Sequence, residues 1–289
     1  MAVSKLDLLY STEREALFQP GIPRADALVD PSPARPCSAQ GLIDTLLDLS
    51  RRLRHLDVRF DADLQAVWCF QRHPGRPCFS LGLLEDVREL QAVLMRTLRA
   101  ERAGSMPVSY LIWASSLPGV YNLGGDLAYF CDLVRAKDAA GLHDYARRCV
   151  DICHINAASL DLPIQTVALV QGDALGGGFE SVLSNDLIIA EEGAKFGLPE
   201  VVFNLFPGMG AYSFLCRRLD AARARSMIMS GRLYEAEELH EMGLIDVLCP
   251  KGQGEQELRR FIERNRRRQN LLTAMAASDD TASRSPIGT

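Results

Sequence analysis

The sequence predicts an α/β fold, in which short buried strands alternate with amphipathic helices. Apolar runs such as "VSYLIWAS" and "IQTVALV" are typical of buried strands. Between them, "LEDVRELQAVLMRTLRAER" places Val87, Leu90, Leu94 and Leu98 at helical spacing, which predicts an amphipathic helix. The chain has 289 residues, 47% hydrophobic and 24% charged, and can therefore form one large apolar core without disulfide bonds.

The proline-rich stretch at 19–40 predicts an extended arm, so we expect residues 1–40 to form an N-terminal arm that is partly disordered. Leucines at helical intervals then predict a helix over 42–56. Apolar runs predict strands at 63–72, 108–115, 164–170, 186–193, 194–197 and 245–250. Helical spacing predicts helices at 84–102, at 127–158 with a break near Gly141, at 178–185, within 205–219, at 222–231 and at 234–243. A short helical segment at 253–276 and a small, polar, disordered tail at 277–289 complete the expected organisation.

Charge and cysteine content exclude several classes of protein. A net charge of -5 gives no reason to expect nucleic-acid binding, and the local arginine clusters are typical of solvated helix faces. Cys149 and Cys153 lie four residues apart beside His154, but no second cluster supplies further ligands, so we expect free thiols and no metal. The sequence has no signal-peptide pattern and no apolar run of membrane-spanning length, which predicts a cytoplasmic protein without membrane insertion.

The stretch "QGDALGGGFE" at 171–180 follows a predicted strand and opens a predicted helix. Glycines at such a turn allow close backbone approach, and the first helical amides point outward without an internal partner. The turn can therefore hold a phosphate or a developing oxyanion. It matches neither the dinucleotide-binding glycine pattern nor the Walker pattern. Taken on its own, the glycine stretch is better explained by close helix–strand packing through glycine.

A second glycine turn, "YNLGGDLAYF", also follows a buried strand and opens a helix, for which Asp126 is the expected N-cap. The backbone amides near Gly125 and Gly177 can then form an oxyanion hole together. Such a pair of amides indicates chemistry at a thioester or ester carbonyl.

Two glutamates accompany the glycine turns. Glu180 lies almost one helical turn beyond Gly177, and Glu200 follows a strand and a proline in "FGLPE". Taken singly, Glu180 could be an acid favoured by a helix dipole and Glu200 a surface loop acid. Taken with both glycine turns, they favour paired acid/base catalysis, in which one removes an α-proton and the other protonates a leaving β-hydroxyl.

These residues resemble the crotonase (enoyl-CoA hydratase/isomerase) superfamily through "NLGGD", "GDALGGGFE", "FGLPEV" and "SGRLYEAEELHEMGLIDVLCP". The resemblance implies a crotonase (ClpP/crotonase-like) ββα superhelix with C-terminal helices and a catalytic domain at 41–252. It implies oxyanion donors at Gly125 and Gly177, catalytic acids at Glu180 and Glu200, and no cofactor. The longer stretches "SLPGVYNLGGDLAYF" and "AEEGAKFGLPEVVFNLFPGMGAYSF" are similar to the diffusible signal factor synthases.

That closer resemblance implies dehydration of a 3-hydroxyacyl thioester, carried on acyl carrier protein or CoA, and then thioester hydrolysis to a cis-2-unsaturated fatty acid signal. It also implies a homotrimer and contact with a sensor histidine kinase, although the chain ends where the family continues with helices. We expect an acyl pocket lined by Phe203, Leu205, Phe206 and Met209, with a plain Pro-Gly turn in the core as the alternative. Two other functions stay open: an enoyl-CoA hydratase/isomerase of fatty acid or secondary metabolism, and a non-catalytic acyl-binding or sensor-binding protein. Acyl length and branching, and the roles of the two glutamates, stay open as well.

Overall fold

The computed structural model describes residues 39–99 and 107–266. All of them belong to the second of two units into which the chain divides, Pro33–Thr289. Residues 1–38 of the expected arm, the end of the helical segment at 253–276 and the expected tail at 277–289 lie outside the described residues. These domain limits therefore stay predictions.

The larger sheet has six strands in the order β1-β2-β3-β5-β7-β10. Their bounds are Leu56–Asp61, Ala66–Gln71, Tyr110–Ser115, Gln165–Val170, Leu187–Glu191 and Val247–Cys249. Strand β1 runs antiparallel to β2, and all other neighbours are parallel. Every residue of β2, β5 and β7 is buried, as expected for parallel strands with both faces covered. The predicted α/β class is thus confirmed.

The second sheet has four short strands in the order β4-β6-β8-β9, with bounds Gly119–Asn122, Gly172–Leu175, Lys195–Gly197 and Leu233–Glu235. The predictions for three of these segments were wrong, because the residues of β4 and β6 were expected to belong to the glycine turns, and most of β9 to the helix at 234–243. Strands β4 and β6 have a glycine at their first position and little apolar periodicity, and they are defined by pairing with each other in parallel. A prediction from local pattern does not detect such strands, since the pairing is a long-range contact.

The helices are α3 to α11 in chain order, at Ala39–Arg52, Leu81–Arg99, Leu127–Ala136, Ala139–Ala157, Gly177–Leu183, Ala211–Arg218, Ala221–Ser230, Ala236–Glu241 and Gly254–Asn265. Short 3-10 helices, η2 and η3, occupy Ser159–Asp161 and Pro199–Phe203. Two predicted bounds were wrong. The first helix ends at Arg52 and is followed by β1, and the long helix is interrupted at Lys137, not at Gly141. Lys137 adopts a left-handed conformation and Asp138 caps the next helix by accepting the Gly141 amide, so polar capping decides this break.

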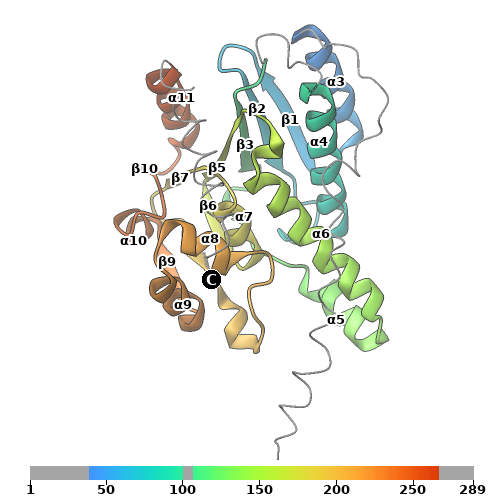
Figure 1. Cartoon of the computed structure of the whole chain (residues 1–289), viewed down its shortest axis with the longest axis vertical. Helices are drawn as coiled ribbons and strands as arrows, with labels where there is room; N and C mark the ends of the chain where they lie inside the picture. Colours follow the sequence, from blue (N-terminus) through green and yellow to red (C-terminus); the bar gives the residue numbers. More distant parts are fainter. Residues whose placement is uncertain (1–38, 100–106, 267–289) are drawn as a thin grey trace, which may run out of the picture. The chain divides into compact units, whose positions relative to one another are not determined.

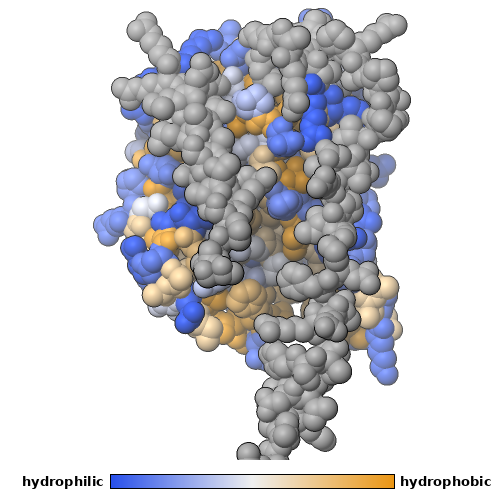
Figure 2. Space-filling view, viewed as in Figure 1, coloured by the Kyte–Doolittle hydropathy of each residue, from blue (hydrophilic) through white to orange (hydrophobic). Residues whose placement is uncertain are grey.

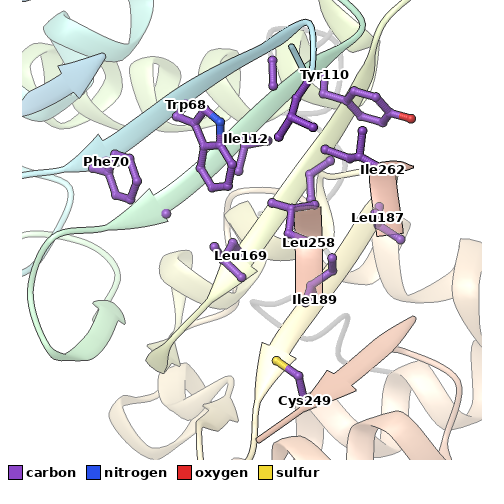
Figure 3. Close-up of a cluster of buried hydrophobic side chains, with 14 residues drawn as sticks. Trp68, Phe70, Tyr110, Ile112, Leu169, Leu187, Ile189, Cys249, Leu258 and Ile262 are labelled. Atoms are coloured by element: carbon purple, nitrogen blue, oxygen red, sulfur yellow. The ribbon is translucent and has the colours of Figure 1, made fainter. Parts of the chain in front are cut away.

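Helices cover both faces of the six-stranded sheet. Helices α3, α4 and α6 lie together at one side of it in Figure 1, and α11 lies at the other. Alternate residues of each strand point to opposite faces, so Trp68, Ile112 and Leu169 meet α11 on one face. There they form an apolar core with Leu258 and Ile262 (Figure 3). This core holds the strands that lead to both glycine turns.

Candidate active site

The two glycine turns lie against each other at the ends of β4 and β6. Gly124, with a φ of 93°, follows β4, and Gly176, with a φ of 52°, follows β6. A Cβ atom on Gly124 would come within 2.9 Å of the Gly177 nitrogen. Both the left-handed backbone and the close approach therefore require glycine.

The amides of Gly125 and Gly177 face the same small region. A Cβ placed on Gly177 would lie 3.7 Å from the Gly125 nitrogen. Helix α7 begins at Gly177, so its amide has no intrahelical acceptor. Among the described residues, neither amide donates a backbone hydrogen bond. The geometry thus offers two neighbouring N–H donors for one acceptor atom.

Glu180 is buried on the first turn of α7, with only 1% of its surface exposed. Its Oε1 accepts hydrogen bonds from the amides of Met209, at 2.8 Å, and Ala211, at 2.9 Å. Burial raises the pKa of Glu180 from its usual 4.5 to about 7, and the nearby charge of Glu200 acts in the same direction. The two amide bonds oppose that rise but do not cancel it. Near neutral pH this carboxyl group can therefore both accept and give up a proton.

Glu200 lies on the first turn of η3, beside the glycine turn that follows β6. A Cβ on Gly176 would lie 2.8 Å from its Oε1, so this carboxyl group packs directly on the turn. Its Oε2 is buried and has no hydrogen-bond partner among the described residues. Burial raises the pKa of Glu200 as well. An unpaired buried carboxyl oxygen is costly to keep in a fold, which is typical of a group that meets a ligand.

The four residues expected to line an acyl pocket lie in two different environments. The Met209 side chain is buried, and a Cβ on Gly177 would come within 2.5 Å of its sulfur. Phe203, Leu205 and Phe206 are exposed, at 62%, 43% and 65%. Apolar side chains gather on the lower part of the face in Figure 2. The acyl-pocket assignment stays a prediction, with Met209 alone packed onto the glycine turn.

A cavity of about 30 Å³ lies between α4, α6 and α7. It is lined by polar and apolar side chains that include Gln91, Ile152 and Asn156, and by none of the four predicted acyl residues. Its size suits a water molecule rather than an acyl chain.

Two residues that support the glycine turns were not expected from the sequence. The side chain of Asn122, which is fully buried, accepts the Gly124 amide at 2.8 Å and donates to Gln71. Tyr145 contacts the turn from helix α6 through the Asp126 amide. An asparagine before two glycines is a recognisable turn signal, whereas nothing in the sequence near Tyr145 indicates this contact. The predicted N-cap is confirmed, because Asp126 accepts the Tyr129 amide.

Within residues 39–99 and 107–266, no three His, Cys, Asp or Glu side chains gather in a way that could hold a metal ion. Cys149 and Cys153 are buried free thiols. In the same described part of the chain, no helix combines the length and apolar character needed to cross a membrane.

Comparison with protein families agrees with this geometry. The model of the family described as enoyl-CoA hydratase/isomerase matches residues 109–285, which include both glycine turns and both glutamates. The chain belongs to the enoyl-CoA hydratase/isomerase family. The crotonase resemblance predicted from the sequence motifs is thereby confirmed.

Individual members of the family match different shares of the chain. The enoyl-CoA isomerase/hydratase fer4 of Mycosarcoma maydis is 30% identical over 201 residues, covering 68% of this chain and 70% of fer4. The putative enoyl-CoA hydratase/isomerase YngF of Bacillus subtilis is 33% identical over 169 residues, covering 58% of this chain and 63% of YngF. A probable enoyl-CoA hydratase of Rhizobium meliloti is 44% identical, but the match spans only a third (33%) of its length.

Solved structures share the fold at lower identity. Pseudomonas aeruginosa DspI superposes with a TM-score of 0.65 at 23% identity, covering 77% of this chain and 84% of that one. An enoyl-CoA hydratase from Shewanella pealeana superposes with a TM-score of 0.70 at 16% identity, covering 84% and 86%. The expected crotonase fold is thus confirmed.

Proposed function

We propose that this family member dehydrates a 3-hydroxyacyl thioester and then hydrolyses the thioester, releasing a cis-2-unsaturated fatty acid of the diffusible signal factor type. The observation that carries the proposal is the unpaired, buried oxygen of Glu200. The Glu200 carboxyl group lies beside the glycine turns. It is also close enough to Glu180 that its charge raises the pKa of Glu180. Two carboxyl groups with raised pKa values supply an acid and a base at the same pH.

In the first step, the thioester oxygen accepts hydrogen bonds from the amides of Gly125 and Gly177. One glutamate takes the proton from Cα while the other protonates the leaving β-hydroxyl, so the products are a 2-enoyl thioester and water. Negative charge develops on the thioester oxygen in the enolate, and the two amides stabilise it there. Because both carboxyl groups are raised in pKa, one can be ionised while its neighbour holds a proton.

In the second step, water attacks the thioester carbon. A glutamate accepts the proton from this water, the same two amides hold the tetrahedral oxyanion, and the thiol of the carrier leaves with a proton. One site thus serves both steps, and no side-chain nucleophile is needed. The carrier is acyl carrier protein or CoA, and the chain acts as a homo-oligomer that also contacts a sensor histidine kinase.

The family match supports a second candidate, an enoyl-CoA hydratase/isomerase without thioesterase activity. Such an enzyme uses the same two carboxyl groups and the same amides, but leaves the thioester intact. The two functions differ only in whether free acid appears.

Mass spectrometry of the products from a 3-hydroxydodecanoyl thioester, on acyl carrier protein and on CoA, tests the proposal. We expect free cis-2-enoic acid from the unmodified protein, and at least about a 100-fold loss in Glu180→Gln and Glu200→Gln, as for removal of other groups that act in the transition state. Glu192→Gln is the matched control, because Glu192 is exposed and follows β7 away from the turns.

Enoyl thioester without free acid would reject the hydrolytic half and leave the hydratase/isomerase. Absence of any product, together with acyl-thioester binding that survives both substitutions, would replace catalysis with the binding-only role.

A further inference from the structure

Tyr145 is a buried residue of α6 whose phenol reaches the glycine turn that follows β4. Its hydroxyl accepts a hydrogen bond from the Asp126 amide at 2.6 Å and donates one to the Phe79 carbonyl at 2.8 Å. The hydroxyl also lies 3.6 Å from the position of a Cβ on Gly125. A single oxygen atom therefore links the helix, the glycine turn and the segment that contains Phe79.

The backbone around Gly125 explains what this link controls. The Phe79 amide donates to the Gly124 carbonyl at 2.7 Å. In a planar trans peptide, the carbonyl of Gly124 and the N–H of Gly125 point in opposite directions. Fixing the Gly124 carbonyl toward Phe79 thus aims the Gly125 N–H away from Phe79.

Tyr145 holds this arrangement from both ends. Its hydroxyl donates to the Phe79 carbonyl and accepts from the amide of Asp126, the residue after Gly125. Both hydrogen bonds use the phenol without leaving its proton for a substrate. Burial raises the pKa of Tyr145, so the hydroxyl stays protonated at neutral pH. Its ring packs edge-on against Tyr129, at 5.4 Å between centroids, and this packing does not depend on the hydroxyl.

We propose that Tyr145 is the positioning residue that aims the Gly125 N–H at the thioester oxygen. The inference rests on the proposed function, in which that amide is one of two oxyanion donors. Tyr145 does not touch the reacting atoms, and it acts through the two peptide groups on either side of Gly125.

The test compares Tyr145→Phe with Tyr110→Phe in the full chain. Tyr110 is a buried tyrosine at the start of β3, and its hydroxyl has no partner among the described residues. Both substitutions keep a buried ring and remove one hydroxyl. Tyr110, however, lies at the first position of β3, whereas the glycine turns follow the last residues of β4 and β6. The first readout is kcat and KM for the 3-hydroxyacyl thioester. The second is the ionisation of a bound 3-oxoacyl-CoA, whose enolate absorbs in the near ultraviolet.

We expect kcat to fall by about 10- to 100-fold in Tyr145→Phe with a much smaller change in KM, since complete loss of an oxyanion donor lowers rates by roughly 10²–10³. The bound 3-oxoacyl-CoA should also need a higher pH to form its enolate. Tyr110→Phe should change neither quantity.

Equal behaviour of the two variants, with an active parent, would overturn the role of Tyr145 and leave the proposed function standing. A parent protein that neither turns over the thioester nor forms the bound enolate would overturn both. A fall in thermal stability shared by the two variants, without the shift in enolate formation, would count against positioning.

Discussion

The buried carboxyl group of Glu180 should make the stability of the protein depend on pH. Its pKa is raised from 4.5 to about 7 in the folded chain, chiefly by burial. The folded state therefore binds this proton more tightly than the unfolded state does. The stabilising contribution is fully present below about pH 4.5 and is lost as the pH rises through about 7.

Glu180→Gln removes this dependence while keeping an acceptor for the amides of Met209 and Ala211, because a glutamine side chain retains one carbonyl oxygen. With the two pKa values above, linkage gives a loss of roughly 2–3 kcal/mol in the free energy of unfolding of the parent between pH 5 and pH 8. The variant should gain stability relative to the parent by that amount over the same range. Glu200 is present in both proteins, so the effect of its own raised pKa largely cancels in the difference.

Urea denaturation at half-unit steps of pH measures this difference, with Glu192→Gln as an exposed control that should follow the parent. Parallel stability curves for Glu180→Gln and the parent would refute the reasoning, because they would mean that Glu180 titrates alike in the folded and unfolded chain. A difference that shrinks with rising pH would show that the carboxylate form is the one the fold stabilises.

Three further substitutions test the packing around the site. Gly178→Ala should lower the free energy of unfolding in urea by about 1–3 kcal/mol or more, because its Cβ would overlap the Asn122 carbonyl. Gly75→Ala, with nothing within 4 Å, should be near neutral, and equal effects of the two would contradict this account. Asn156→Ala should cost about 1–3 kcal/mol in thermal unfolding, because it leaves the Trp113 indole N–H, now bonded at 2.7 Å, without its acceptor. Arg218→Lys should lower the melting temperature, since lysine cannot reproduce the guanidinium fork that reaches three backbone carbonyls and a carboxylate at once. An unchanged melting temperature would argue against that role.

The larger sheet was predictable because its central strands are buried on both faces and read as continuous apolar runs. Strand β1 was missed for a different reason: "LDVRFD" directly follows a leucine-rich helix, and its first leucine fits the helical spacing too. Strands β4, β6 and β9 have only three or four residues each. Their pairing partners are distant in sequence, so long-range contacts decide what local propensity leaves open.

For the site, the sequence could indicate which groups take part but not what surrounds them. Glu180 and Glu200 stood out because acids next to glycine turns are uncommon in a core. The two amides that bond to Glu180 come from Met209, in the loop before α8, and from Ala211, the first residue of that helix, and backbone amides carry no residue-specific signal. Tyr145 was equally hidden, since a tyrosine on an amphipathic helix is ordinarily part of the core. Exposure and hydrogen bonding of single atoms depend on the assembled fold.

The three consecutive glycines connect this fold to its chemistry, and each is required for a different reason. Gly176 needs a left-handed backbone and lies against the Glu200 carboxyl group. Gly177 leaves room for the Met209 sulfur, and Gly178 lets the strand that ends at Asn122 touch the helix. A side chain at any of these positions would push the two turns, or the acids beside them, apart. The same close packing that lets the second sheet meet α7 thus brings two free amides, the buried carboxyl group of Glu180 and the partly buried one of Glu200 to one place.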